Sequence, residues 1–338
     1  MKRRFAVVGC GSIGARHLRN LAALGCADLI AVDPDPARRE EAAAAAVGAQ
    51  TAPDVSTALA AGASVVLVAA PTALHVDVAR EAVDAGADLF VEKPLAATLD
   101  GVDELIEAAD RHRTTALVAC NLRFHPGLRR LRELARAGAI GRVVSARLEF
   151  GSWLPDWRPS QDYRDGYAVR RASGGGIVLD AIHELDYARW LVGDVHSVAC
   201  FADRLSSLEL ETEDVAAVLL RFAGGAIGEV HLDYVQRDYS RTCQVIGEAG
   251  TLRWDFTTGE TRLYAAGDGK WRSFGPASTW TLNDMYVAEL EHFLACLRGE
   301  AAPEQSLRDG RRALEIALAA LASAEDGSVV RLDTKVAA

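Results

Sequence analysis

The first 120 residues alternate short, almost continuously apolar runs with alanine-rich stretches of helical pattern. Apolar runs of this kind are typical of parallel strands buried on both faces, with the helices as crossover connections. The sequence therefore predicts an α/β domain with a parallel sheet over residues 1–120. Its predicted strands are 5–8, 29–32, 65–69, 89–91 and 116–119, and its predicted helices are 13–24, 35–47, 73–85 and 98–111.

The pattern changes near residue 120, where apolar and polar residues begin to alternate as they do in an antiparallel sheet with one buried face. Two such segments, 214–222 and 226–235, flank Ala223-Gly224-Gly225, which predicts a hairpin. We expect residues 121–338 to form an α+β domain for substrate binding and oligomerisation, whose final helices can pack back on the first domain. Its other predicted strands are 142–150, 241–247, 251–256 and 260–265, and its predicted helices are 125–137, 177–192, 283–298 and 306–322.

The bulk composition argues against several classes of protein. The formal net charge of −10 is opposite in sign to that of a nucleic-acid-binding surface. No segment approaches the roughly 18 apolar residues that span a bilayer, so we expect no membrane insertion. The six cysteines form no CxxC pair, and no histidine is grouped at metal-ligand spacing, so no metal site is indicated. Free thiols are typical of a reducing compartment, which favours a cytoplasmic location.

A glycine-rich turn, Gly9-x-Gly11-x-x-Gly14, lies between the first predicted strand and the first helix. Glycines at this spacing allow a tight turn and let a pyrophosphate approach the helix N-terminus. Asp33 ends the second predicted strand, 19 residues after Gly14, where a carboxylate accepts hydrogen bonds from a ribose and repels a 2′-phosphate. The sequence thus predicts NAD rather than NADP. Arg38 and Arg39 weaken this preference, and the alternative for them is a solvated helix face.

Two further segments follow the ends of predicted parallel strands, where open sheets bind their ligands. One is Ala70-Pro71-Thr72-Ala73-Leu74-His75, which we expect to border the nicotinamide, and the other is Glu92-Lys93-Pro94. Lys93 in this position can stabilise a developing alkoxide or relay its proton. The alternative is an exposed lysine in a loop. The predicted cofactor-binding residues are Gly9, Gly11, Ser12, Ile13, Gly14, Asp33, Arg38, Ala70, Pro71, Thr72, His75, Glu92, Lys93 and Asn121.

A second group of chemically active side chains lies in the predicted helix 177–192. Asp180, His183 and Asp186 recur at every third position and so share one side of a continuous helix. A carboxylate near a histidine orients it and raises its basicity, so His183 is a candidate for removing a hydroxyl proton. A structural histidine paired with a neighbouring acid is the alternative.

The irregular segment 151–171 is long for a loop inside a compact domain, and such loops are usually functional. It carries several aromatic residues and arginines, and we expect substrate contacts from Trp157, Tyr163 and Arg164, together with Arg123. Its arginines can meet a carboxylate or a nucleotide diphosphate. Internal ion pairs with neighbouring aspartates are the alternative. The arginines are Arg158, Arg164, Arg170 and Arg171, and the aspartates are Asp156, Asp162 and Asp165.

Taken together, these motifs resemble the glucose-fructose oxidoreductase / inositol dehydrogenase / rhizopine-catabolism protein (Gfo/Idh/MocA) family over nearly the whole chain. The resemblance rests on the segments Gly9–Gly14, Pro71–His75, Glu92–Pro94 and Gly174–Asp186. It implies an α/β Rossmann domain and an α+β domain with a large, mostly antiparallel open sheet. It also implies reversible oxidation of a hydroxyl, or reduction of a ketone, on a sugar or cyclitol.

The resemblance further implies roles for individual residues. In the family, the lysine of the Glu-Lys-Pro tripeptide and the histidine of the later helix serve catalysis, and these map to Lys93 and His183. An aspartate often stands four residues before that histidine. This chain has Leu179 there and Asp180 one residue later, so Asp180 becomes a third catalytic candidate at a different spacing.

The resulting hypothesis is an NAD-dependent oxidoreductase that interconverts a hydroxyl and a ketone on a sugar, nucleotide sugar or cyclitol. Lys93 and His183 would handle protons and contact the substrate. A nucleotide-sensing regulator without turnover, and a reductase of a non-sugar ring, are the alternatives. Because one face of an antiparallel sheet must be covered, we also expect a homodimer or homotetramer.

Overall fold

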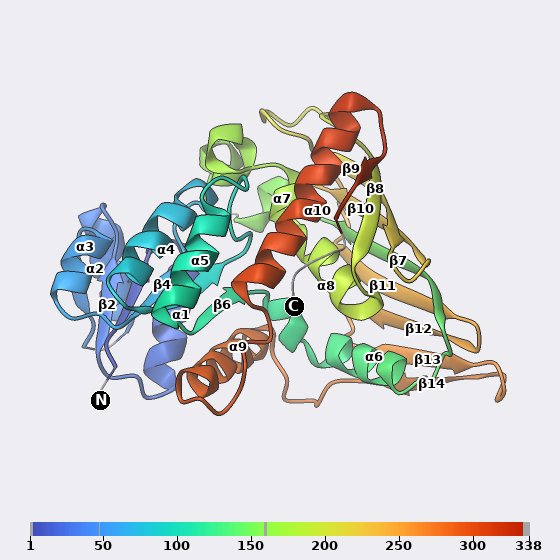
Figure 1. Ribbon diagram of the computed structural model, residues 1–338, viewed down its shortest axis with the longest axis horizontal. Coiled ribbons are helices and arrows are strands. Elements are labelled where there is room, and N and C mark those ends of the chain that lie inside the picture. Colours follow the sequence, from blue (N-terminus) through green and yellow to red (C-terminus); the bar gives the residue numbers. More distant parts are fainter. Residues whose placement is uncertain (1–2, 47, 159–160, 334–338) are drawn as a thin grey trace. The chain divides into compact units, whose positions relative to one another are not determined.

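The computed structural model describes residues 3–46, 48–158 and 161–333 (Figure 1). The chain divides into two compact units. The first comprises Met1–Asn121 and Leu282–Arg312, and the second comprises Leu122–Thr281 and Ala313–Ala338.

The first unit is built on a six-stranded sheet in the order β3-β2-β1-β4-β5-β6, in which every pair of neighbours is parallel. The central strands are buried along their whole length, as their continuous apolar runs predict. Since the strands are parallel, their carboxyl ends meet at one edge, where the glycine turn and the Glu-Lys-Pro tripeptide both lie. The strands are β1 (Phe5–Val8), β2 (Leu29–Val32), β3 (Gln50–Ala52), β4 (Val65–Val68), β5 (Asp88–Glu92) and β6 (Ala116–Ala119).

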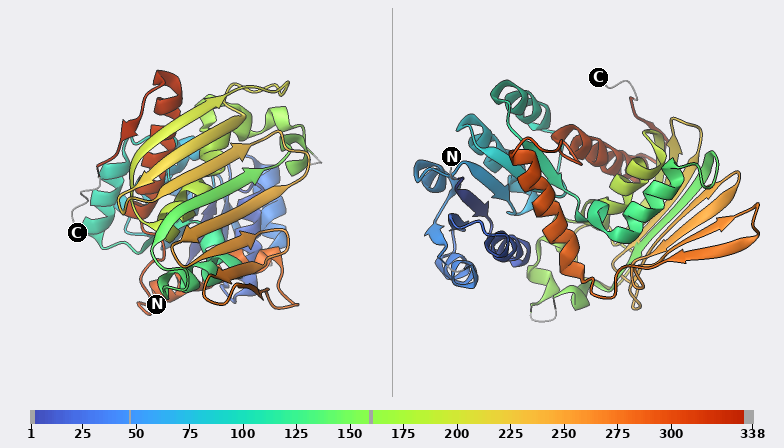
Figure 2. Two further views of the ribbon diagram at one scale, coloured as in Figure 1. Left: turned by 90° about the vertical axis from the view of Figure 1, so that its right-hand side faces the viewer. Right: turned by 90° about the horizontal axis from the view of Figure 1, so that it is seen from below.

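Helices cover both faces of this sheet (Figure 2). On one face, α1 packs against α2 and also against α9, a helix from late in the chain. Leu290, Phe293 and Leu297 of α9 join the same hydrophobic core as the first strands, which explains why this late segment belongs to the first unit. The helices are α1 (Ser12–Ala23), α2 (Pro36–Ala45), α3 (Val55–Ala60), α4 (His75–Asp84), α5 (Val102–His112) and α9 (Leu282–Leu297).

The second unit is built on a nine-stranded sheet in the order β14-β13-β12-β11-β7-β10-β9-β8-β15 (Figure 2, left). All neighbours are antiparallel except β7 and β10, which are parallel. The predicted hairpin around Ala223-Gly224-Gly225 is confirmed, because it joins β9 to β10. The strands are β7 (Val143–Gly151), β8 (Val195–Asp203), β9 (Val215–Phe222), β10 (Ile227–Asp233), β11 (Ser240–Gly247), β12 (Gly250–Asp255), β13 (Thr261–Ala265), β14 (Lys270–Phe274) and β15 (Val330–Arg331).

One face of this sheet carries the helices of the unit, which enclose its core (Figure 2, right). Tyr187, Trp254 and Phe222 are among the largest fully buried side chains of that core. The two parts of the structure together confirm the predicted fold class of a Rossmann domain with a large, mostly antiparallel sheet domain. The helices are α6 (Pro126–Arg136), α7 (Ile177–Asp180), α8 (Ile182–Val192) and α10 (Leu307–Asp326), and α10 begins in the first unit and continues in the second.

One helix prediction was wrong. The sequence predicts a continuous helix over 177–192, whereas α7 and α8 are separated at Ala181, whose ψ of 29° lies outside the helical range. The first backbone N–H groups of α7 donate to Glu213, that of Ile177 to its carbonyl at 3.2 Å and that of Val178 to its carboxylate at 3.1 Å. Because α7 ends at Asp180 and α8 begins at Ile182, Asp180 and His183 do not share one helix.

Candidate functional site

The glycine turn of the first unit has the tight geometry that its spacing predicts. Gly9 has a φ of 96°, and a Cβ atom on it would lie 2.5 Å from the carbonyl oxygen of Ala69. A Cβ on Gly14 would lie 1.8 Å from the carbonyl oxygen of Gly9. A Cβ on Gly11, in contrast, would meet no described atom within 4 Å. Two of the glycines are thus needed for packing, while Gly11 faces open space at the start of α1.

The N-terminus of α1 is suited to an anion. Gly11 is its N-cap and provides no side-chain hydrogen bond, and the first turn contains no acidic residue. The first N–H groups of the helix and the positive end of its dipole therefore face the open space beside Gly11. A pyrophosphate is the group that such a turn accommodates.

Asp33 fixes this turn from the end of β2. The buried carboxylate accepts the backbone N–H of Cys10 at its Oδ2 atom and that of Asp35 at its Oδ1 atom, each at 2.9 Å. Arg38, a predicted cofactor contact, is exposed and lies 3.6 Å from Asp35. This position agrees with the alternative of a solvated helix face.

The structure also offers a polar group for the far end of a dinucleotide. The side-chain oxygen of Asn121, at the end of β6, is buried and accepts no hydrogen bond from the described residues. Buried amide oxygens are normally hydrogen-bonded. This acceptor and the open glycine turn are the two local features that fit an NAD molecule along the carboxyl edge of the sheet.

The Glu-Lys-Pro tripeptide is held in place by a buried hydrogen bond between His17 and Glu92. Nε2 of His17, on α1, lies 2.7 Å from Oε1 of Glu92, and the backbone N–H of Lys93 donates to the Glu92 Oε2 atom at 3.2 Å. His17 is fully buried and Glu92 is 9% exposed. The Lys93-Pro94 peptide bond is cis. Lys93 itself is half-buried and stands directly after β5, as predicted.

His75 ties the two loops of this edge together. Its Nδ1 atom lies 2.9 Å from the carbonyl oxygen of Pro94, and its Nε2 atom lies 2.8 Å from that of Ala70. The side chain is 1% exposed, and burial is the main cause that lowers the pKa of His75. This arrangement makes His75 a link between the loops after β4 and β5, with both ring nitrogens turned towards backbone.

A second buried acid stands near Glu92. Glu289, on α9, is fully buried, and neither of its carboxyl oxygens has a hydrogen-bond partner among the described residues. Tyr286 and Phe293, three residues before it and four after, contact the rings of His17 and Phe90, so Glu289 lies on the same face of α9. Burial, and secondarily the charge of Glu92, raises the pKa of Glu289 well above its ordinary value.

In the second unit, the environment of Asp180 differs from the one that the sequence predicts. The hydroxyl of Tyr167 donates to its Oδ1 atom at 2.6 Å, and the hydroxyl of Tyr234 donates to its Oδ2 atom at 3.0 Å. Burial, followed by the charge of Asp180, raises the pKa of Tyr234 well above its ordinary value, which keeps this hydroxyl a donor. His183 lies in the first turn of α8 and is 8% exposed.

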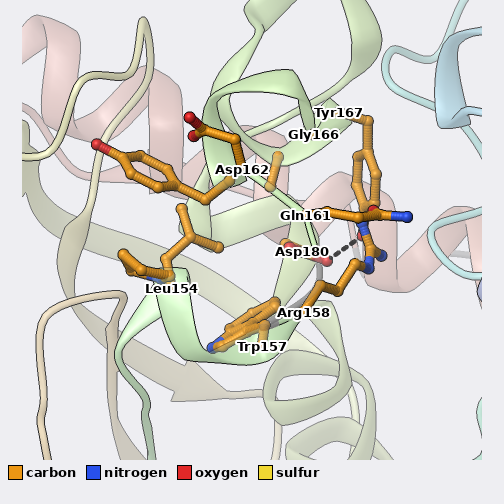
Figure 3. Close-up of a pocket in the computed structure, with 11 residues that line it drawn as sticks. Leu154, Trp157, Arg158, Gln161, Asp162, Gly166, Tyr167 and Asp180 are labelled. Carbon is orange, nitrogen blue, oxygen red and sulfur yellow. Dashed lines mark hydrogen bonds between the residues drawn. The ribbon is translucent and has the colours of Figure 1, made fainter.

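Asp180 also lines a pocket formed mainly by the segment after β7 (Figure 3). Trp157 packs its ring against Tyr234 and Phe150 and so forms a wall of this pocket. Arg158 and Gln161 point towards the same end of the pocket as the Tyr167 hydroxyl. The lining residues are Leu154, Pro155, Trp157, Arg158, Gln161, Asp162, Tyr163, Gly166, Tyr167, Ala168 and Asp180.

Of the other predicted substrate contacts, Tyr163 lines the pocket, whereas Arg164 and Arg123 form ion pairs with acidic residues. Tyr163 lines the pocket, and its hydroxyl accepts the backbone N–H of Glu209 at 3.1 Å. Arg164 is bound to Asp162 at 2.6 Å and to Glu209 at 3.1 Å, which is the ion-pair alternative. Arg123 is 2% exposed and forms a bidentate ion pair with Asp186 at 2.7 and 2.8 Å. Its guanidinium therefore stabilises the fold of the second unit through Asp186.

Sequence reasoning missed three groups that the structure places at these sites. His17 was not singled out as the hydrogen-bond partner of Glu92, Glu289 was not singled out as a buried acid near Glu92, and Tyr234 was not linked to Asp180. A signal existed for Glu289, because it is an acid on the apolar face of its helix. Tyr234 directly follows a strand, and the sequence alone does not indicate which acid it meets.

Neither a metal site nor a membrane-crossing helix is found among the described residues. No three His, Cys, Asp or Glu side chains of residues 3–46, 48–158 and 161–333 lie together as a metal-binding group. Within the same ranges, no helix combines the length and apolar character that a membrane crossing requires. All six cysteines are free.

Comparison with known proteins places these features in context. Residues 3–120 match the model of an oxidoreductase family with an NAD-binding Rossmann fold, and residues 128–253 match the Gfo/Idh/MocA C-terminal domain. The chain is 33% identical to the myo-inositol dehydrogenase Hyg17 of Streptomyces leeuwenhoekii, over 96% of this chain and 98% of that protein.

Solved structures agree with this assignment. The WlbA dehydrogenase of Bordetella pertussis, in complex with NADH and UDP-GlcNAcA, is 26% identical with a TM-score of 0.84, over 99% of this chain and 100% of that one. GenD2 from gentamicin A biosynthesis, in complex with NAD, is 27% identical with a TM-score of 0.83, over 99% and 97%. The predictions of an NAD cofactor and of a dehydrogenase or reductase acting on CH–OH groups are confirmed. The chain belongs to the Gfo/Idh/MocA family of NAD-dependent oxidoreductases.

Proposed function

We propose that this enzyme interconverts a hydroxyl and a ketone on a sugar, nucleotide sugar or cyclitol. The observation that carries the proposal is that Lys93 stands at the same carboxyl edge of the parallel sheet as the open turn at Gly11. A relative that dehydrogenates myo-inositol, and a structural neighbour bound to UDP-GlcNAcA, support this class of substrate.

When bound, NAD would supply the hydride acceptor for the carbinol carbon. The N-terminus of α1 and Gly11 would hold its pyrophosphate, Asp33 would face the adenosine ribose, and Asn121 would contact the nicotinamide half. Ala70, Pro71 and Thr72 line the same edge, and His75 supports it by joining the two loops. Each of these residues belongs to the first unit.

The proton of the substrate hydroxyl passes to His183, and the ammonium of Lys93 stabilises the oxyanion as the hydride leaves. Positioned acid–base catalysis contributes roughly 10²- to 10⁴-fold to a rate. Asp180 is held by Tyr167 and Tyr234, and its negative charge then serves to orient the proton-handling groups rather than to accept the proton.

Turnover of candidate substrates with NAD tests the proposed function. Purified enzyme with NAD should raise the absorbance of NADH when it is given members of a panel of sugars, cyclitols and nucleotide sugars. Lys93→Met and His183→Ala should each lower kcat by at least about 10²-fold and leave NAD affinity within a factor of about three. Near-wild-type kcat in both variants would reject the catalytic assignment. NAD binding without turnover on any substrate would favour the regulator instead.

We further propose a homodimer or homotetramer that forms through the face of the nine-stranded sheet opposite its helices. Phe201, Leu219 and Ile227 are 86%, 53% and 45% exposed there. The same face carries a cross-strand ion pair at 3.1 Å between Arg147 and Glu229, so it contains both signs of charge for a second copy. Light scattering that gave a monomer, or an unchanged mass for Phe201→Glu, would contradict the proposal.

A cytoplasmic location is also part of the proposed function and is supported by the free cysteines.

A further inference from the structure

The pocket of the second unit contains two carboxylates, and hydrogen-bond donors already satisfy both. Arg164 binds both oxygens of Asp162, at 2.6 to 3.0 Å. The hydroxyls of Tyr167 and Tyr234 bind one oxygen each of Asp180. The acidic groups of this pocket thus carry little attraction for a cationic ligand.

Arg158 differs from Arg164 in having no carboxylate partner among the described residues. Its guanidinium stands 5.6 Å from the centre of the Tyr167 ring, and within the described ranges it forms no ion pair or hydrogen bond. The cation–π contact orients the group and leaves its donors available. An arginine with five N–H donors in a planar fork matches a carboxylate in both charge and shape.

Gln161 lies beside Arg158 at the same end of the pocket (Figure 3). The backbone N–H of Gln161 donates to the carbonyl of Arg158 at 2.9 Å. The Gln161 amide, like the guanidinium, has no hydrogen bond among the described residues. The pocket therefore presents two adjacent groups of donors next to the hydroxyl of Tyr167.

We propose that Arg158, assisted by Gln161, binds a carboxylate of the substrate, so that the preferred substrates are sugar acids. This inference rests on the proposed function, because it names the substrate class of the same site. One guanidinium and one neutral amide match the single charge of a carboxylate. A phosphate or diphosphate carries more negative charge than a carboxylate and would need a second cation. Arg164, the neighbouring arginine of the pocket segment, does not supply one, because it is already bound to two carboxylates.

The experiment compares matched substrates in the presence of NAD: glucose with glucuronate, UDP-glucose with UDP-glucuronate, and glucose 6-phosphate as the phosphate arm. Wild-type enzyme should have a higher kcat/KM for the acid of each pair. Arg158→Gln should lower kcat/KM for the acid by about 10- to 100-fold, mainly through KM, and leave that for the neutral partner unchanged. Arg164→Gln is the matched control and should preserve the preference for the acid.

Three kinetic outcomes would overturn the inference: a preference of the wild type for the neutral sugars, an equal loss for acid and neutral substrates in Arg158→Gln, or a preference for glucose 6-phosphate over glucuronate. A binding measurement separates this inference from the proposed function. If no substrate turns over, calorimetry of UDP-glucuronate and UDP-glucose with the NADH-loaded protein decides it. Tighter binding of UDP-glucuronate that is lost in Arg158→Gln supports the carboxylate site, and equal or no binding refutes it.

Discussion

The ring of His17 and the carboxylate of Glu92 form a buried pair with 2.7 Å between Nε2 and Oε1. The pair lies directly behind Lys93, because the second oxygen of Glu92 accepts the Lys93 backbone N–H. Removal of His17 would leave a buried carboxylate without its main partner, which is strongly destabilising. We expect His17→Leu to lower the free energy of unfolding by about 3 kcal/mol, measured by urea denaturation.

His112, exposed at the end of α5, provides the control for this measurement. His112→Leu should change the unfolding free energy by less than about 0.5 kcal/mol. A loss in His17→Leu no larger than in this control would show that Glu92 does not depend on the histidine.

Glu289 predicts a specific pH dependence of stability. Its pKa in the folded state is raised well above 4.5 by burial and by Glu92, so the folded protein keeps a proton that the unfolded chain releases. Stability from this group is complete below the unfolded pKa and is lost as the pH rises towards the folded pKa. Because glutamine does not titrate, Glu289→Gln should gain stability over wild type by up to about 1.4 kcal/mol per pH unit above 4.5.

Urea denaturation between about pH 5 and pH 9 measures this difference. Glu291, exposed on the same helix, supplies the control, since Glu291→Gln removes one charge from the surface. Its stability curve should run parallel to that of the wild type. If the curve of Glu289→Gln were parallel as well, Glu289 would have to be ionised in the folded protein.

The glycine turn allows folding and cofactor binding to be separated. Gly11→Ala adds a methyl group that meets no described atom, so its unfolding free energy should change by less than about 1 kcal/mol. The same methyl group enters the space proposed for the pyrophosphate, and NAD affinity should fall by at least about 10-fold. Gly14→Ala is the contrasting variant, because its Cβ would lie 1.8 Å from a carbonyl oxygen and should destabilise the fold itself. Calorimetric NAD titration with thermal unfolding measures both effects, and unaltered NAD affinity in Gly11→Ala would refute the pyrophosphate position.

The hydroxyl of Tyr234 is expected to stabilise Asp180. Tyr234→Phe removes one of the two donors of a buried carboxylate and should lower the unfolding free energy by about 2 kcal/mol. Tyr264→Phe, on the sheet face opposite the helices, is the matched control and should cost less than about 0.5 kcal/mol. Urea denaturation of both variants gives the comparison. If both variants lost the same unfolding free energy, the hydrogen bond from Tyr234 to Asp180 would not stabilise the fold.

The sequence allowed much of the first unit to be predicted, because its strands are buried on both faces and read as unbroken apolar runs. Three strands of the second unit were missed, the two-residue β15 and, for physical reasons, β8 and β14. β14 has no buried residue, so it shows no apolar alternation. In β8 the register shifts between Val195 and Ser197, and the highly exposed Phe201 adds an apolar residue on the outer face.

Side-chain partners at the site were less predictable than the elements that carry them. Arg158 and Arg164 differ because Arg164 binds the neighbouring Asp162 and also Glu209, which lies far along the chain. The break at Ala181 could not be expected either, since alanine favours helix. Such differences come from tertiary contacts, which local patterns do not encode.

The parallel pairing of β7 with β10 has a consequence for how this enzyme can change. Gly151 and Asp233 pair at the same edge of the sheet, and the chain after Gly151 is fastened there by a hydrogen bond from Leu154 to the Tyr234 carbonyl at 3.0 Å. The described residues of this segment, 152–158 and 161–175, supply no strand to the sheet. We therefore expect that grafting this stretch from a relative would change substrate selectivity while β7 and β10 remain paired.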